Sequence, residues 1–162
     1  MTNLLVSFLS LFGVAMSEPN SDSIVSRHGE VWLASQPSEA DLDAWAAAGA
    51  VLVVNSRTPE ETAALAFDIR AAVESRGMRY AELPTGGASG ASSALTGELS
   101  GLLSASDGPV VLHCRSGTRS AHLYAAYLID QDPTISTPFD TMNWPGGRDM
   151  GMVRALTPAT DR

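Results

Sequence analysis

Two short stretches of the chain, residues 50–55 and 110–113, are apolar at almost every position and rich in β-branched side chains. A strand with one face in water alternates apolar and polar residues, whereas a strand covered on both faces reads as a continuous apolar run, as in parallel sheets. Helical patterns separate these stretches and begin at capping residues such as Ser38 and Thr58. The alternation predicts a single α/β domain with a central, mostly parallel sheet flanked by helices.

The same signals predict the order of the elements along the chain. Strands are expected at residues 30–35, 50–55, 78–83 and 110–113, and helices at 38–48, 58–76, 96–104 and 119–131. One folded domain is expected over residues 24–132, after a polar linker at 18–23. Residues 133–162 are rich in Pro, Gly, Thr and Asp, and we expect an irregular tail that packs through Trp144.

An apolar run over residues 4–16 lies near the start of the chain. It is too short to span a bilayer but has the length of a signal-peptide core, so no stable membrane span is expected. Small residues, Ala15 and Ser17, stand at plausible cleavage positions, although no basic residue precedes the run. We therefore expect residues 1–17 to be a signal for export to the periplasm. The alternative is a buried strand or helix in a cytoplasmic protein.

Charge and cysteine content exclude several classes of function. The 162 residues carry a formal net charge of −8, whereas nucleic acids and anionic membranes bind to basic faces, so no nucleic-acid partner is expected. All ten basic residues are Arg, which excludes Schiff-base chemistry through Lys. The single cysteine, Cys114, excludes an intramolecular disulfide, and the three histidines lack metal-ligand spacing. We expect no metal and no organic cofactor.

The most informative segment follows the second apolar run and reads Cys-Arg-Ser-Gly-Thr-Arg-Ser over residues 114–120. The strand places Cys114 at the carboxyl edge of the sheet, where open α/β sheets bind ligands. A short loop then enters a helix, whose N-terminus lowers the pKa of nearby cysteine thiols to about 3.5–7.5. Arg119 can bind an anion over this loop, and Ser120 can donate a hydrogen bond to the thiolate. Cys114, Arg119 and Ser120 are therefore the predicted catalytic residues.

Other residues are predicted to hold a substrate anion or to support the loop. The backbone N–H groups of the loop form the expected anion cradle, with candidates Arg115, Ser116, Gly117 and Thr118. Arg57 ends a strand at the same edge, where it either binds a substrate anion or pairs with Glu60 or Glu61. His113 is expected to be a buried hydrogen-bonding partner that orients the loop. His122 is expected at the surface.

Residues 113–120 resemble the active-site loops of two families, the tyrosine-phosphatase-like enzymes and the rhodaneses. Residues 31–42, together with 48–49 and 53–57, resemble the bacterial beta-lactamase hydrolase-like protein, phosphatase-like domain family. The resemblance covers about residues 30–130. It implies a tyrosine-phosphatase-like fold and makes residues 24–132 the phosphatase-like catalytic domain. The upstream sequence patterns of a true rhodanese are absent.

Two features of the sequence favour sulfur transfer over phosphate hydrolysis. Four residues separate Cys114 from Arg119, whereas tyrosine phosphatases have five, and a tighter loop suits a persulfide with one terminal atom. Residues 84–93 contain no Asp or Glu to protonate a leaving group. We therefore favour a sulfurtransferase acting through a Cys114 persulfide, with a phosphatase as the alternative. A non-catalytic anion-binding or redox-sensing domain is the third reading. The expected partner is a small anion, either a sulfane-sulfur donor or a phosphate ester.

Overall fold

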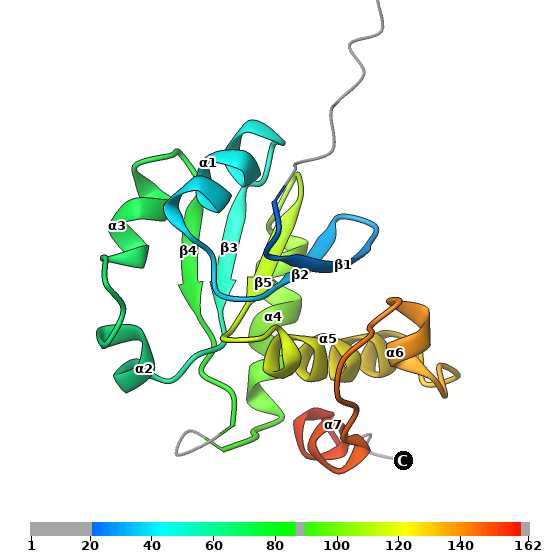
Figure 1. Cartoon of the computed structure of the whole chain (residues 1–162). Coiled ribbons are helices and arrows are strands. Elements are labelled where there is room, and N and C mark those ends of the chain that lie inside the picture. Colours follow the sequence, from blue (N-terminus) through cyan, green and yellow to red (C-terminus); the bar gives the residue numbers. More distant parts are fainter. Residues whose placement is uncertain (1–20, 87–89, 160–162) are drawn as a thin grey trace, which may run out of the picture.

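The computed structural model describes residues 21–86 and 90–159 and has a five-stranded sheet at its centre (Figure 1). The strands are β1 (Ile24–His28), β2 (Val31–Ala34), β3 (Leu52–Asn55), β4 (Arg79–Glu82) and β5 (Val110–His113). Their order across the sheet is β1-β2-β5-β3-β4, and only β1 runs antiparallel to its neighbour. The predicted α/β fold with a mostly parallel sheet is confirmed.

Helices cover both faces of this sheet. In the described residues they are α1 (Glu39–Ala47), α2 (Pro59–Ala63), α3 (Ile69–Glu74), α4 (Ala94–Ser104), α5 (Thr118–Gln131), α6 (Pro138–Thr141) and α7 (Met150–Leu156). One core lies beneath α1 and α3, and the other lies beneath α4 and α5, with α6 and α7 packed against α5 (Figure 1). The sheet therefore separates two apolar cores.

The strand β5 lies in the middle of the sheet and contributes to both cores. Val110 and Leu112 pack beneath α4 and α5, while Val111 packs beneath α1 and α3. Burying each such side chain contributes about 1.5–3 kcal/mol. This two-sided burial is the reason that the sequence of β5 is an uninterrupted apolar run.

The register of the parallel strands aligns the ends of β2, β3 and β5. His113 at the end of β5 stands opposite Asn55 of β3 and Ala34 of β2. Beyond the strands, the N–H of Ser56 donates to the carbonyl of His113 at 2.8 Å. Three loops consequently leave the sheet at one edge, the edge at which open α/β folds bind their ligands.

The predicted continuous helix over residues 58–76 is wrong, because residues 64–68 separate α2 from α3. The side chain of Asp68 accepts a hydrogen bond at 3.0 Å from the first turn of α3 and thereby caps a new helix. Leu65 and Phe67 pack against the core beneath α1 and α3. Local propensity favours a continuous helix, but burial of these side chains requires the break.

The C-terminal segment, expected to be irregular, contains α6 and α7 within its described part. Trp144 is 1% exposed, which confirms that this segment packs through Trp144. Val153 and Leu156 of α7 are buried in the core beneath α4 and α5. These residues form part of the domain rather than a tail.

The N-terminal part of the described chain also differs from the prediction. No strand was expected at β1, which pairs with β2 through a turn at Gly29, where φ is 56°. The expected linker is packed from Ser21 onward, because the Ser21 hydroxyl donates to Asp41 and accepts from the Trp45 indole. The expected export signal, residues 1–17, lies outside the described residues. Every helix in the described residues is too short or too polar to cross a bilayer.

The burial of Trp144 predicts that the C-terminal segment stabilises the whole domain. Trp144→Ala should lower the free energy of unfolding by about 3–5 kcal/mol, because it removes a buried indole and leaves a cavity. Ser136→Ala, an exposed position of the same segment, should change it by about 0.5 kcal/mol or less. Denaturant unfolding measures both values. Equal, small effects would contradict the assignment of this segment to the domain.

Candidate active site

Cys114 follows β5 directly and begins a tight loop that leads into α5. The residue is buried, with 1% of its surface exposed. Gly117 turns the loop with φ at 86° and stands at the N-cap of α5. A Cβ atom on Gly117 would lie 2.8 Å from the Trp144 ring and 3.1 Å from the Ala34 carbonyl oxygen. The backbone angle and this close packing both require glycine, so the predicted turn at Gly117 is confirmed.

The loop ends at the N-terminus of α5, the longest of the described helices. The first hydrogen bond of this helix runs from the N–H of Ala121 to the carbonyl of Gly117 at 2.9 Å. The N–H groups of residues 118–120 precede this bond and have no acceptor within the helix. Together with the helix dipole, these donors make the start of α5 suitable for an anion.

Arg119 forms a bidentate ion pair with Glu61, the central electrostatic contact of the site. Its two terminal nitrogens lie 2.7 and 2.9 Å from the carboxylate oxygens of Glu61. Glu61 also accepts the N–H of Thr58 at 3.0 Å and completes the capping box of α2. The Arg119 hydrogen bonds, and then the Thr58 N–H, lower the pKa of Glu61 to about 2. Glu61 therefore carries a full negative charge at neutral pH.

The guanidinium of Arg119 also lies close to the Cys114 sulfur. The pKa of Arg119 is raised, first by its hydrogen bonds to Glu61 and in smaller part by its interaction with Cys114. The predicted pairing of Arg119 with Cys114 at one site is thus present. The Glu61 partner was missed by the sequence analysis, which considered it only for Arg57. The sequence did contain a signal for this contact. Thr58 and Glu61 form a capping box shortly after a strand that ends at this edge of the sheet.

Ser120 occupies the predicted place but makes a different hydrogen bond. It is buried, and its hydroxyl donates to the Ser56 hydroxyl at 3.1 Å. The expected donation from Ser120 to the thiolate is therefore wrong for this structure. The Ser56 contact ties the first turn of α5 to the loop after β3.

His113 is buried, as expected, but it does not orient the loop through a hydrogen bond. Neither ring nitrogen has a hydrogen-bond partner in the described part of the chain. Two main effects act on the pKa of His113. Burial lowers it and is the larger effect, while the nearby Cys114 backbone raises it without meeting hydrogen-bond geometry. The pKa of His113 is thereby lowered to about 4. The ring is therefore neutral at neutral pH and supplies no proton there.

His122 differs from its expected surface position, since only 2% of it is exposed. Its Nε2 atom accepts the N–H of Asp149 at 2.7 Å, which leaves the proton on Nδ1. That Nδ1 lies 2.6 Å from the Thr118 carbonyl oxygen and donates to it. His122 thus connects the start of α5 to the start of α7.

Arg57 lies at the same edge of the sheet, in the loop after β3. Its Nη1 donates to the Gln36 side-chain oxygen at 2.7 Å. The expected alternative, an ion pair with Glu60 or Glu61, is wrong, since within residues 21–86 and 90–159 no carboxylate pairs with Arg57. The Gln36 N–H donates to the Arg115 carbonyl at 3.1 Å, so Arg57 and Gln36 flank the Cys114 loop.

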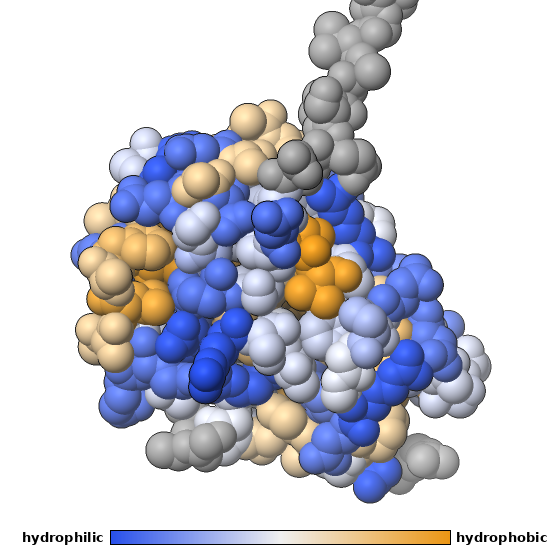
Figure 2. Space-filling model, in the orientation of Figure 1, coloured by the Kyte–Doolittle hydropathy of each residue, from blue (hydrophilic) through white to orange (hydrophobic). Residues whose placement is uncertain are grey.

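The remaining loop residues line its outer side. The Arg115 and Ser116 side chains are exposed, and the hydroxyls of Ser116 and Thr118 lie 3.1 Å apart. Strongly hydrophilic side chains gather between α2 and the start of α5 on this face (Figure 2). Within the described residues, no three His, Cys, Asp or Glu side chains gather to hold a metal. The site is therefore a polar, arginine-rich surface around a buried sulfur.

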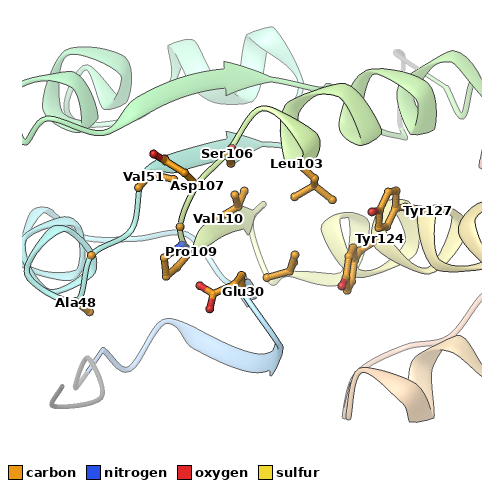
Figure 3. A pocket seen from close by; sticks show the side chains of 13 residues that line it. Glu30, Ala48, Val51, Leu103, Ser106, Asp107, Pro109, Val110, Tyr124 and Tyr127 are labelled. Carbon is orange, nitrogen blue, oxygen red and sulfur yellow. The ribbon is translucent and has the colours of Figure 1, made fainter. Parts of the chain in front are cut away.

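A separate pocket of about 680 Å³ lies at the opposite edge of the sheet, where β2, β3 and β5 begin. Glu30, Pro109, Tyr124 and Tyr127 are among the residues that line it (Figure 3). The Tyr124 hydroxyl is already hydrogen-bonded to His28 at 2.8 Å. Cys114 does not line this pocket, and the candidate chemistry stays at the Cys114 edge.

Comparison with known proteins agrees with the fold and with the resemblance to the phosphatase-like domain family. The family model of the beta-lactamase hydrolase-like protein, phosphatase-like domain, matches residues 28–130. No match is found among curated proteins. These findings support the phosphatase alternative over the sulfurtransferase that the sequence analysis favoured.

Solved structures similar to this chain include a kinase-associated phosphatase and candidate phosphatases. A candidate phosphatase from Neisseria meningitidis is 19% identical with a TM-score of 0.64, covering 83% of this chain and 95% of that chain. A kinase-associated phosphatase, its catalytic-site cysteine replaced by serine, is 15% identical with a TM-score of 0.65, covering 78% and 83%. TpbA of P. aeruginosa in complex with phosphotyrosine is 21% identical with a TM-score of 0.57, covering 78% and 75%.

These likenesses confirm the predicted tyrosine-phosphatase-like fold. The family model covers well over half of the chain, from the last residue of β1 to the last turn of α5. The chain therefore belongs to the beta-lactamase hydrolase-like protein, phosphatase-like domain family.

Proposed function

We propose that this protein is a cysteine-dependent phosphatase that hydrolyses phosphate monoesters through a phosphocysteine at Cys114. The observation that carries the proposal is the position of Arg119, held by Glu61 beside the Cys114 sulfur at the start of α5. Glu61 uses two of the five guanidinium N–H groups of Arg119, and those that remain can bind a phosphoryl group, whose charge a helix N-terminus also favours. Family membership supports the same reaction class.

The reaction proceeds in two displacements at phosphorus. In the first, the Cys114 thiolate forms an S–P bond while the bond from phosphorus to the ester oxygen breaks, and the alcohol leaves as its oxyanion with the bonding electron pair. In the second, a water oxygen attacks phosphorus, the S–P bond breaks with its electron pair returning to sulfur, and the protons of the water stay on the departing inorganic phosphate. Arg119 and the N–H groups of residues 115–120 stabilise the equatorial oxygens in both transition states.

The supporting residues act on the shape and charge of this site. Gly117 allows the loop to turn, and Ser116 and Thr118 line its outer side with hydroxyl groups. Ser120 fixes the first turn of α5 through Ser56, which makes it a positioning residue rather than a catalytic one. Arg115 lies at the exposed rim, where its charge attracts anionic substrates.

A missing proton donor limits which esters this site can hydrolyse. Glu61 is the carboxylate bound to Arg119, and with a pKa of about 2 it carries no proton to donate at neutral pH. The sequence from Leu83 to Gly97 contains no Asp or Glu. The ester oxygen must therefore leave as an anion, which favours esters of acidic alcohols such as phenols.

Replacement of the nucleophile tests the reaction class. Cys114→Ser should abolish hydrolysis of 4-nitrophenyl phosphate, because no S–P bond can form. Intact mass measured after exposure to thiosulfate separates the two chemistries, and we expect no added sulfur on the wild-type protein. Persistent hydrolysis in Cys114→Ser would end the proposal. A sulfur gained by wild type and not by Cys114→Ser would instead establish the sulfurtransferase.

The lack of a proton donor predicts a strong dependence on the leaving group. General acid catalysis contributes about 10²–10⁴-fold, mostly to poor leaving groups. The wild-type kcat/KM for 4-nitrophenyl phosphate should therefore exceed that for phenyl phosphate by about 100-fold or more. A series of substituted phenyl phosphates measures the slope. A flat dependence on the pKa of the phenol would mean that some group does protonate the leaving oxygen.

Glu61 should act by positioning Arg119, and its contribution to the stability of the protein should depend on pH. Glu61→Gln preserves a capping side chain but removes the charge opposite Arg119, so kcat/KM should fall by about tenfold. The folded-state pKa of Glu61, about 2, lies below its ordinary value of 4.5. Its contribution to stability is thus complete above pH 4.5 and is lost as the pH falls towards 2.

Thermal unfolding measured from pH 7 to pH 2 checks this assignment. The Tm difference between wild type and Glu61→Gln should be constant above pH 4.5 and close as the pH falls towards 2. Glu60→Gln is the matched control, because Glu60 is exposed on the same helix. A difference that persisted unchanged to pH 2 would rule out the ion pair as its cause.

A further inference from the structure

Arg57 is a cation at the active-site edge that the proposed chemistry does not use. Its Nη1 is held by the neutral side chain of Gln36 at 2.7 Å. Its Nε is buried and has no hydrogen-bond partner in the described part of the chain. A buried donor without an acceptor is destabilising, and more so when it is charged. The Nη2 of Arg57 has no hydrogen-bond partner in the described residues and is not buried, so a ligand can reach the guanidinium there.

The neighbouring carboxylate of Glu61 is not available to Arg57. Both of its oxygens are bound by Arg119, and one also accepts the N–H of Thr58. The charge of Arg57 acts on Glu61 only through space, as the smallest of the effects on that carboxyl. The two arginines are thus electrostatically distinct: Arg119 has an anionic partner within the protein, whereas Arg57 has a neutral one.

The backbone places Arg57 next to the Cys114 loop. Its neighbour Ser56 donates its N–H to the carbonyl of His113 and accepts the Ser120 hydroxyl. On the other side, Gln36 donates its N–H to the carbonyl of Arg115. Arg57 is therefore connected, through one residue on each side, to both ends of the loop that would hold a phosphoryl group.

We infer that Arg57 is a second anion-binding residue and that the substrate carries a second anionic group besides the phosphate ester. This inference rests on the proposed phosphatase activity and names its substrate class: phosphate esters with a further phosphate or carboxylate in the same molecule. The first anion binds at Arg119 and the start of α5. The second binds the accessible Nη2 of Arg57, and Gln36 holds that side chain in place through Nη1.

Direct binding of phosphonates tests this without depending on turnover. Isothermal titration calorimetry at pH 7.5 compares methylphosphonate with methylene-, ethylene- and propylene-diphosphonate, which carry a second anion at increasing distance. At least one diphosphonate should bind wild type about tenfold or more tightly than methylphosphonate, the effect of one added charge-assisted hydrogen bond. Arg57→Gln should remove this advantage.

The matched control is Arg79→Gln, which makes the same charge change at the opposite end of the sheet. Arg79 is exposed, begins β4 and bonds to Ala105 and Ser106. This variant should keep the diphosphonate advantage. If Arg57→Gln does not fold, Arg57→Lys keeps the charge but loses the planar fork, and the advantage should fall without vanishing.

The outcomes separate this inference from the proposed function. If no diphosphonate binds wild type more tightly than methylphosphonate, or if the advantage survives Arg57→Gln, the assignment of Arg57 is overturned. Hydrolysis of 4-nitrophenyl phosphate that depends on Cys114 would leave the phosphatase standing in either case. Absence of both that hydrolysis and methylphosphonate binding would overturn the phosphatase itself.

Discussion

The in-register pairing of β5 with β2 and β3 is the constraint on which the site depends. Three parallel strands end at the same level, with His113 between Asn55 and Ala34. Each strand is then followed by a loop that contributes to one edge, and the two cores fix the strands from both faces. A shift in register would move Cys114 away from Ser56 and Gln36, and it would also exchange the residues that face each core.

Glu61 links the local rules of helix formation to the chemistry of the site. As the third residue of a capping box, it starts α2 by accepting the N–H of Thr58. The same carboxylate holds Arg119 with both of its oxygens. The orientation of Arg119 therefore depends on a helix of only five residues.

The parts of this protein that were predictable from sequence are those set by local pattern. The apolar run of β5, the caps at Ser38 and Thr58, and the Cys114–Gly117–Arg119 spacing all carry signals within a few residues. The parts that were missed depend on contacts between distant segments. Trp144 packs against Gly117, and the imidazole of His122 accepts a hydrogen bond from the Asp149 N–H. The residues next to each of these side chains in the sequence do not indicate such distant partners.

The length of the Cys114 loop was one of two arguments for sulfur transfer, and the start of α5 weakens it. Counting the residues between Cys114 and Arg119 leaves out the N–H groups of Arg119 and Ser120. Because Gly117 ends the loop at the N-cap of α5, the N–H groups of residues 118–120 face the same end of the helix without helical acceptors. Those donors and the Arg119 fork together can match three phosphoryl oxygens. Four residues between the cysteine and the arginine therefore do not by themselves argue against phosphoryl transfer.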